Sequence, residues 1–238
     1  MTVLSVSADE KLVIIPDIHN KCDAAERIIS NENPDKVVFL GDYFDSFYDT
    51  VEDADCTSKW LAKSLRQKGR THLIGNHDLS YMTCNPQLRC TGYDPAKHEI
   101  IRQNNIPWNK MSLFCWADDW LCTHAGLTRQ FYMRQKSDSV QSFLEMSRHD
   151  LENMDADCAH PFFQAGFRRG GTEPVGGILW CHYDEFADIA GVRQVFGHTR
   201  DNIIRHKKTG NSEHYCIDTQ LNHYMVYQAH AMKVKPAK

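Results

Sequence analysis

Short apolar runs alternate with helical patterns over the first third of the chain. Residues 12–15 and 36–40 are compact apolar runs of the kind found in buried strands, and residues 71–74 form a third. Between the first two runs, apolar residues recur at helical spacing, and the stretch before the third run predicts a helix. The inner face of that second helix is expected to carry Cys56, Trp60, Leu61 and Leu65. This order of elements predicts right-handed crossovers and a mainly parallel sheet.

The pattern changes after residue 78. Residues 79–110 are polar and rich in turn signals, such as Asp94-Pro95, and predict an irregular insertion. Residues 111–116 and 119–122 predict a hairpin, and helical segments are expected between about residues 128 and 155. Residues 178–180 and 193–196 are strand candidates. Residues 202–205 and 214–217 predict a hairpin with its turn at 207–211, which residues 224–229 would extend. We expect one α/β domain over residues 1–238, with a more antiparallel second half.

Composition places the chain among ordinary globular proteins. Of its 238 residues, 42% are hydrophobic and 24% are charged. With 27 basic and 31 acidic residues the formal charge is −4, so nucleic acid is not a favoured partner. No apolar run approaches the roughly 20 residues of a membrane helix, and the first ten residues do not resemble a signal peptide. The nine cysteines include no Cys-x-x-Cys pair, which favours reduced thiols and a cytoplasmic location.

Candidate ligands follow the expected strands. The side chains that lie just past these runs are Asp17, His19, Asp42, Asp45, Asn76, His77, His124 and His198. Since the carboxyl ends of parallel strands share one edge of a sheet, these side chains are predicted to converge there. Carboxylate, imidazole and amide donors suit Mn, Fe, Zn or Ni better than Ca. The donors outnumber the needs of one ion. We therefore expect two divalent cations, with Mn favoured, and phosphoester hydrolysis by an activated water.

Five short motifs appear in order along the chain. They are Asp-x-His at Asp17, Gly-Asp-x-x-Asp at Asp42, Gly-Asn-His-Asp at Asn76, His-Ala-Gly at His124 and Gly-His-Thr at His198. Together they resemble the calcineurin-like metallophosphoesterase superfamily from residue 17 to about residue 219. The resemblance implies a sandwich of two mixed sheets flanked by helices.

The same resemblance implies a role for each motif residue. Asp17 and His19 would bind a first metal, and Asp42 would bridge both metals. The second metal would be held by Asn76, His124 and His198. His77 would protonate the leaving group while Asp45 orients its ring, and a hydroxide held between the metals would attack phosphorus. Asp45 could instead simply cap a helix, and Asp78 and Asp218 are expected to fix loops.

The last motif narrows the subtype. Gly197-His198-Thr199-Arg200 lacks the second histidine of many phosphodiesterases and nucleases. The chain is most similar in its motifs to bacterial and phage phosphatases related to protein Ser/Thr phosphatases. Those carry an arginine directly after the Asp45 position, where this chain has Ser46. The phosphate-binding guanidinium is therefore expected from Arg168, Arg169 or Arg200, although the first two could form only a solvated pair.

These observations predict a metal-dependent phosphatase acting on phosphomonoesters or phosphoproteins. The alternative is a nucleotide-directed hydrolase, such as a dinucleoside polyphosphatase, a cyclic phosphodiesterase or a nuclease. A non-catalytic scaffold of the same fold ranks lower, because every motif residue is present. Insertions at about 79–110 and 128–176 are expected to form the sides of the substrate-binding cleft. His182 could line this cleft or have a structural role.

Overall fold

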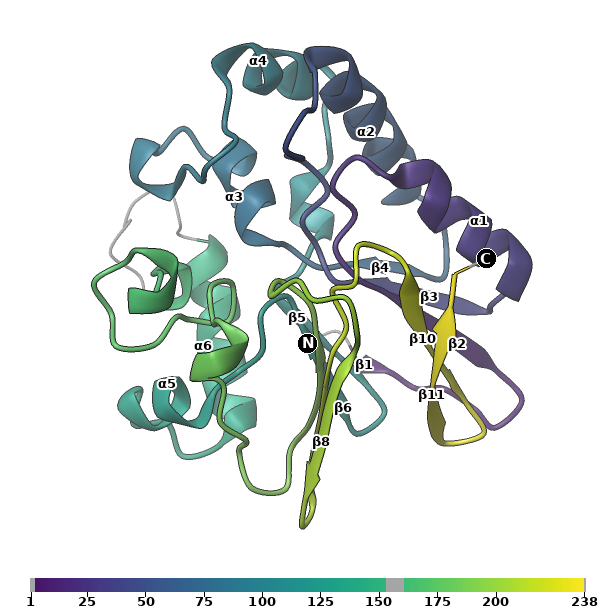
Figure 1. Cartoon of the computed structure of the whole chain (residues 1–238), viewed down its shortest axis with the longest axis vertical. Coiled ribbons are helices and arrows are strands. Elements are labelled where there is room, and N and C mark those ends of the chain that lie inside the picture. The colour runs from purple at the N-terminus through teal and green to yellow at the C-terminus, as the bar shows by residue number, and fades with distance from the viewer. Residues whose placement is uncertain (1–2, 153–160, 238) are drawn as a thin grey trace.

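Two β-sheets pack face to face in the computed structural model, which describes residues 3–237 apart from residues 153–160. Helices lie on the outer sides of the pair, with α1 and α2 on one side and α5 and α6 on the other (Figure 1). One sheet has the strand order β11-β10-β2-β3-β4, and the other has the order β1-β5-β6-β7-β9-β8. Both sheets mix parallel and antiparallel neighbours. The expected sandwich of two mixed sheets is confirmed.

The element bounds within the described residues are as follows. The strands are β1 (Val3–Leu4), β2 (Lys11–Ile15), β3 (Lys36–Phe39), β4 (Arg70–His72), β5 (Phe114–Ala117), β6 (Trp120–Thr123), β7 (Arg193–Phe196), β8 (Arg205–Thr209), β9 (Ser212–Cys216), β10 (His223–Gln228) and β11 (Ala231–Pro236). The α-helices are α1 (Cys22–Glu32), α2 (Val51–Ser64), α3 (Asn76–Met82), α4 (Pro95–Gln103), α5 (Arg129–Arg134) and α6 (Val140–Glu152). Short 3-10 turns are η1 (Pro86–Leu88), η2 (Trp108–Lys110), η3 (Pro161–Phe163), η4 (Phe167–Arg169) and η5 (Tyr183–Glu185).

Strand β2 shows why its sequence is apolar at successive positions. Leu12 and Ile14 point into the layer between the two sheets, where they share a cluster with Val195 of β7. Val13 and Ile15 point the other way, into a cluster that includes Ile28 of α1. A strand buried on both faces needs apolar side chains on both, so the run is continuous rather than alternating.

The predicted irregular insertion at 79–110 is wrong in part. Helix α3 continues to Met82 and α4 runs over Pro95–Gln103. Asp94-Pro95 is not a turn but the start of α4, because the Asp94 carboxylate accepts hydrogen bonds from Ala96 N and Lys97 N and proline occupies the first helical position. The inner face of α2 also differs from the expectation. Cys56 is exposed, and small residues such as Ala54 and Ala62 are buried there instead.

The second half of the chain corrects three strand predictions. Residues 178–180 form a turn, with Trp180 N donating to Gly177 O. The late hairpin turns at residues 210–211, and residues 207–209 belong to strand β8. Residues 224–229 do not extend this hairpin: β10 pairs with β2 and β11 in the other sheet, as Figure 1 shows at the right. Apolar runs alone do not specify which sheet a strand joins.

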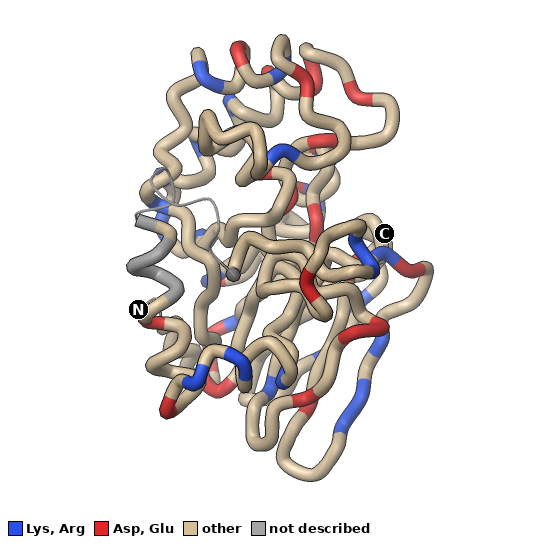
Figure 2. Tube along the Cα trace, turned by 90° about the vertical axis from the view of Figure 1, so that its left-hand side faces the viewer, with Lys and Arg blue, Asp and Glu red and all other residues tan. Residues whose placement is uncertain are grey.

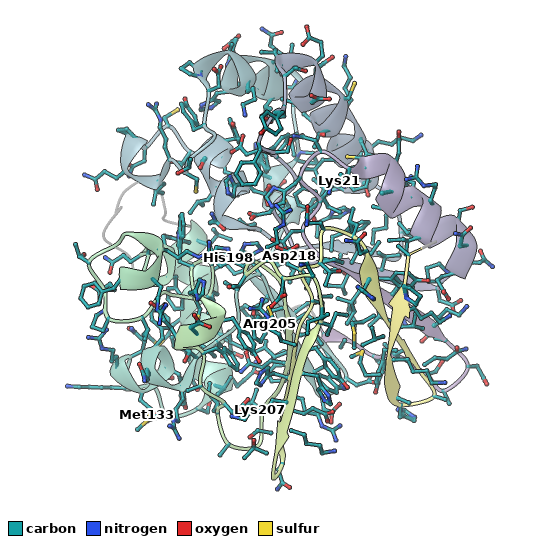
Figure 3. All side chains as sticks on the ribbon, viewed as in Figure 1. Lys21, Met133, His198, Arg205, Lys207 and Asp218 are labelled. Carbon is teal, nitrogen blue, oxygen red and sulfur yellow. The ribbon has the colours of Figure 1, made fainter. Side chains whose placement is uncertain are left out.

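The strands that precede the five motifs end at one edge of the molecule. β2, β3 and β4 are parallel neighbours in one sheet, and β6, β7 and β9 are parallel neighbours in the other. Hydrogen bonds join these loops: Gly197 N donates to His124 O within the six-stranded sheet's set, and His198 N donates to the Asp17 carboxylate of the other set. Figure 3 shows His198 and Asp218 near this upper end of the strands. Within the described residues, no helix has the length and apolar character needed to cross a bilayer.

Candidate metal centre

The loops that carry the motif residues adopt an uncommon backbone conformation. Positive φ angles occur at His19 (43°), Asp42 (50°), Asp45 (62°) and His198 (65°), all of them non-glycine residues. Such conformations persist only when surrounding contacts enforce them, and they cluster at functional sites. Here the backbone N–H groups of Ile18 and His19 both donate to Asp42 O. The two loops are therefore fixed against each other before any side chain is considered.

Two glycines allow the carboxylates of the site to come close to backbone. A Cβ atom at Gly75 would overlap the Asp42 carboxylate, and one at Gly197 would overlap the Asp17 carboxylate. Asp78 holds the same backbone segments together. Its carboxylate accepts hydrogen bonds from Asp42 N, Tyr43 N and Gly75 N at 2.8 Å each, as expected for a residue that fixes the turn.

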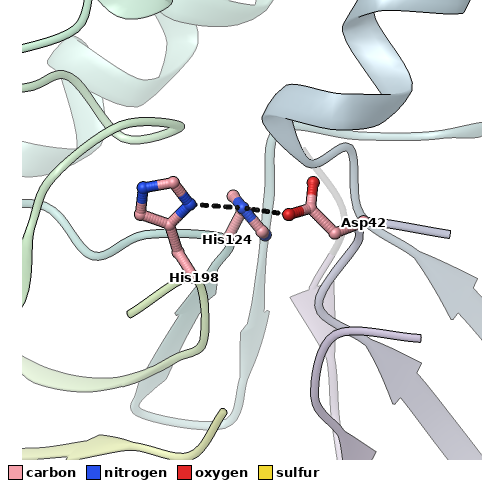
Figure 4. A group of neighbouring side chains, drawn as sticks. All are labelled: Asp42, His124 and His198. Carbon is pink, nitrogen blue, oxygen red and sulfur yellow. Dashed lines mark hydrogen bonds and ion pairs between the residues drawn. The ribbon is translucent and has the colours of Figure 1, made fainter. Parts of the chain in front are cut away.

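Asp42 belongs to two groups of potential metal ligands. One group is Asp17, His19 and Asp42, and the other is Asp42, His124 and His198; within each group the ligand atoms lie within 4.8 Å of one another. Asp42 Oδ2 lies 3.4 Å from His124 Nε2 and 3.9 Å from His19 Nε2. Figure 4 shows the second group in a row, with His124 between Asp42 and His198. A carboxylate shared by two ligand groups can bridge two cations.

The second group crowds acceptor atoms around His124. Its Nδ1 lies 2.9 Å from Leu40 O, so its Nε2 is turned toward the site. Nε2 lies 3.0 Å from Asn76 Oδ1 and 3.1 Å from His198 Nδ1. One imidazole proton cannot serve the Asp42 carboxylate, an amide oxygen and a second imidazole together. A divalent cation would satisfy all four groups, so the donor set fits a metal such as Mn, Fe, Zn or Ni.

The two carboxylates of the first group, Asp17 and Asp42, are buried, and His19 is half-buried. Asp17 is 2% exposed, and burial together with neighbouring Asp218 raises its pKa well above the usual range. Burial would raise the pKa of Asp42 as well, but His124 and His77 lower it well below its usual range. Burial opposes charge on His124, yet Asp42 raises its pKa to about 9. Several buried carboxylates with few fixed cations form a site that a bound cation would stabilise.

Beside these groups lies a histidine–carboxylate pair. His77 Nδ1 is 2.9 Å from Asp45 Oδ2, and the backbone N–H of His77 donates to Asp42 Oδ1. The ring of His77 meets that of His19 edge-on, with centroids 5.5 Å apart. His77 is thus held at the border of the first ligand group, with one ring nitrogen bound to Asp45. A carboxylate bound to one ring nitrogen fixes the orientation of an imidazole.

Of the three candidate arginines, the structure brings Arg169 to the site. Its Nη2 donates to His198 O at 3.1 Å, and its buried Nε has no hydrogen-bond partner among the residues that the structure describes. Burial lowers the pKa of this guanidinium, whereas Asp42 and Asp17 oppose the decrease. Arg168 instead faces solvent and pairs with Asp184 at 3.4 Å, and Arg200 is exposed. His182 is half-buried and accepts a hydrogen bond from Asp184 N, which is a local structural role.

Three residues of the site were not foreseen from the sequence. Lys97 Nζ and Tyr81 Oη both donate to Asp45 Oδ1, at 2.7 and 2.6 Å. Cys90 lies behind Asn76, with its Sγ 3.3 Å from Asn76 Nδ2, which turns Asn76 Oδ1 toward His124. All three come from the region predicted to be irregular. A helical pattern after Asp94-Pro95 was the available signal for Lys97.

Residues 10–201 match the family model of calcineurin-like phosphoesterases. The chain belongs to the calcineurin-like phosphoesterase family. It is accordingly a hydrolase acting on phosphoesters, and the sequence-based family assignment is confirmed. No curated protein sequence matches the chain.

Solved structures of phosphatases share this fold. A cold-active protein-tyrosine phosphatase from a psychrophilic Shewanella species has a TM-score of 0.65 at 13% identity, covering 100% of this chain and 82% of that chain. A protein serine/threonine phosphatase from Saccharomyces cerevisiae, similar to human phosphatase PP5, has a TM-score of 0.61 at 13% identity, covering 100% and 83%. At these identities the likeness shows the calcineurin-like fold and leaves the substrate to other arguments.

Proposed function

We propose that this calcineurin-like phosphoesterase hydrolyses phosphomonoesters or phosphoproteins with two divalent cations, Mn being favoured, in the cytoplasm. The observation that carries the proposal is the position of Asp42 in two ligand groups that otherwise have no member in common. Asp17 and His19 would complete one cation site, and Asn76, His124 and His198 the other. Cations bound there would acidify a water and polarise the phosphoryl group.

The chain's own groups account for the remaining chemistry. His77, oriented by Asp45, would donate a proton to the leaving oxygen, since the dyad geometry leaves its other ring nitrogen free of Asp45. Arg169 would bind a phosphate oxygen, because its buried Nε has no partner within the described part of the chain while its Nη2 donates to His198 O. Backbone contacts hold these groups in place beforehand, so little reorganisation is needed on substrate binding.

A nucleotide-directed hydrolase is the second candidate. Phe47 and Tyr48 directly follow the Asp45 loop and are 87% and 96% exposed. Two adjacent solvent-exposed aromatic rings, two and three residues after Asp45 in the sequence, offer faces on which a nucleobase could stack. This observation favours a nucleotide over a small aliphatic phosphomonoester. It does not favour a nuclease, since acidic residues exceed basic ones in the chain.

The decisive experiment is a substrate panel on metal-free protein. The protein is stripped with chelator and resupplied separately with Mn, Ni, Zn, Fe, Mg or Ca. Each form is then assayed on a phosphopeptide, 4-nitrophenyl phosphate, diadenosine tetraphosphate, a cyclic nucleotide and single-stranded DNA. We expect turnover of the first two substrates with Mn and none with Ca. Fastest turnover of diadenosine tetraphosphate would establish the nucleotide alternative, and a metal-replete protein inert on all substrates would indicate a scaffold.

A further inference from the structure

Helix α4 places a buried lysine behind the His77–Asp45 pair. The Lys97 side chain is only 7% exposed, and its Nζ lies 2.7 Å from Asp45 Oδ1 and 3.1 Å from Asp49 Oδ2. Buried lysines are rare unless they are paired, because removing the charge from water is costly. Two carboxylates compensate this one. Because its ammonium group is paired with these two carboxylates, Lys97 is not expected to bind a phosphate.

Lys97 controls one side of the Asp45 carboxylate. Asp45 Oδ2 faces His77 Nδ1, whereas Asp45 Oδ1 accepts from Lys97 Nζ and Tyr81 Oη. A carboxylate with donors on both oxygens has its plane fixed, and so has the imidazole bound to it. Without Lys97, Tyr81 alone would hold Oδ1. The ring of His77 would then be oriented less strictly.

The same lysine links three segments that are distant in sequence. Lys97 also contacts Asp49 Oδ2, which accepts a hydrogen bond from Asn20 Nδ2. Asn20 is the residue directly after the first motif, which ends at His19. The position of α4 is itself fixed by the Asp94 cap at its start. Lys97 is therefore a rigid support reaching from α4 to the loops after β2 and β3. Lys97, Asp49 and Asn20 lie outside the five motifs, and through Lys97 they hold Asp45, the last residue of the second motif.

We infer that Lys97 is a positioning residue that locks Asp45, and through it His77, in the orientation required to protonate the leaving group. The inference rests on the proposed function, because it assigns Lys97 to the proton donor of that reaction. Its effect should therefore depend on the leaving group. Substrates whose leaving oxygen needs a proton depend on His77 orientation, whereas nitrophenolate leaves without one.

The test compares Lys97→Met with Lys59→Met. Lys59 pairs with Asp55 on the surface of α2, with a side chain 63% exposed, and serves as the matched control. For Lys97→Met we expect kcat on a phosphopeptide or alkyl phosphate to fall about 10- to 100-fold. On 4-nitrophenyl phosphate kcat should fall less than threefold, with KM and bound metal unchanged. Lys59→Met should match the wild type on both substrates.

Tyr81→Phe provides a second variant if Lys97→Met does not fold. It removes one hydrogen bond to the same Asp45 oxygen while keeping the ring, and it should shift the substrate ratio in the same direction by a smaller factor. An equal loss on both substrates for the folded variants would overturn the inference.

A spectroscopic readout separates this inference from the proposed function. In Zn²⁺-loaded protein the proton on His77 Nδ1 should give a protected, downfield NMR resonance in the wild type. We expect Lys97→Met to shift it and to speed its exchange with water, and Lys59→Met to leave it unchanged. If the wild type is inert on every phosphoester, the proposed function fails, yet this measurement still tests whether Lys97 holds the dyad. An unchanged resonance in folded Lys97→Met would refute the inference.

Discussion

His77 and Asp42 are neighbours, but we expect their substitution to have different effects on turnover and on bound metal. His77 contacts Asp45 and the Asp42 carboxylate through different atoms, and it belongs to neither ligand group. We predict that His77→Ala keeps its metals and loses about 100-fold or more in turnover of substrates with poor leaving groups. Nitrophenyl phosphate hydrolysis should fall less than tenfold. Kinetics on the two substrates, with metal analysis of the same samples, check this. Equal losses would remove the proton-donor role.

Asp42→Ala should act on the metals themselves. Because the Asp42 carboxylate is shared by both ligand groups, its loss removes a ligand from each and leaves His124 without its closest carboxylate. We predict that bound metal falls to less than one ion per chain and that activity is abolished. Elemental analysis after gel filtration measures the first effect. A fully metallated, active Asp42→Ala protein would exclude Asp42 as the bridging ligand.

Site residues could be predicted from the sequence where they are neighbours within one motif. Pairs such as Asp17 and His19, or Asn76 and His77, are two or one residues apart, so the strand ends bring them together directly. Lys97 reaches Asp45 across 52 residues, from a helix that packs against α2 and α3. No local pattern encodes such a contact. Arg169 could be separated from Arg168 and Arg200 only once the chain path was known, because their sequence surroundings offer the same chemistry.

Helices α2 and α3 both have an aspartate at their third position that caps the start of the helix, at the surface in α2 and buried in α3. In α2, the third residue Asp53 accepts from Thr50 N at the surface; in α3, the third residue Asp78 accepts from Gly75 N and also from two backbone N–H groups of the loop after β3. Asp78 thereby joins two elements as well as capping one. Its burial raises its pKa to about 7.

We predict that Asp78→Ala lowers the free energy of unfolding by roughly 3 kcal/mol or more, because three buried N–H groups lose their acceptor. It should also weaken metal binding, since Asp42 is carried by the loop that Asp78 holds. Asp53→Ala should cost about 1 kcal/mol, the usual loss for a helix cap, and leave metal affinity unchanged. Urea denaturation and metal titration of both variants test this comparison. Similar effects in the two variants would show that Asp78 is only a cap.

The elements that apolar runs define could be predicted, and the pairing of strands could not. β2 and β3 were expected close to their observed bounds because both are buried on two faces. The first strand of the late hairpin was expected at residues 202–205, but β8 runs over Arg205–Thr209; four of its five residues are exposed and its sequence is largely basic, which resembles a turn. β10 was assigned to the wrong neighbour because the run of apolar residues that forms it fits either sheet equally well.

Over the whole molecule, charged residues of both signs are spread along the chain. Figure 2 shows acidic and basic residues interspersed, with a basic stretch along the exposed strand β8. The C-terminal strand is joined to α1 by Glu32, which accepts from Lys235 and from Tyr224. The early strand β2 and the late strands β10 and β11 also lie in the same five-stranded sheet. This supports our proposal that residues 1–238 form one domain.

One buried histidine that belongs to neither ligand group makes the stability of the whole fold sensitive to pH. His72 is 2% exposed, stacks on Phe39 and has hydroxyl partners on both nitrogens, Tyr43 Oη at 2.8 Å and Ser64 Oγ at 2.9 Å. Burial, with a smaller contribution from Arg70, lowers its pKa from 6.5 to about 3. Between these two values the unfolded chain takes up a proton that the folded chain does not, so stability falls as the pH decreases below about 6.5.

We predict that His72 contributes about 2 kcal/mol to the loss of folding free energy between pH 7.5 and pH 5, since one pKa unit corresponds to about 1.4 kcal/mol. His72→Gln removes this titration while keeping a polar group at the same position. Exposed His230, with a side chain 69% accessible, provides the control His230→Gln. Urea denaturation of all three proteins at both pH values isolates the effect, because the other titrating groups are common to them. A loss of stability in His72→Gln as large as in wild type would show that His72 is not the group that takes up the proton on unfolding.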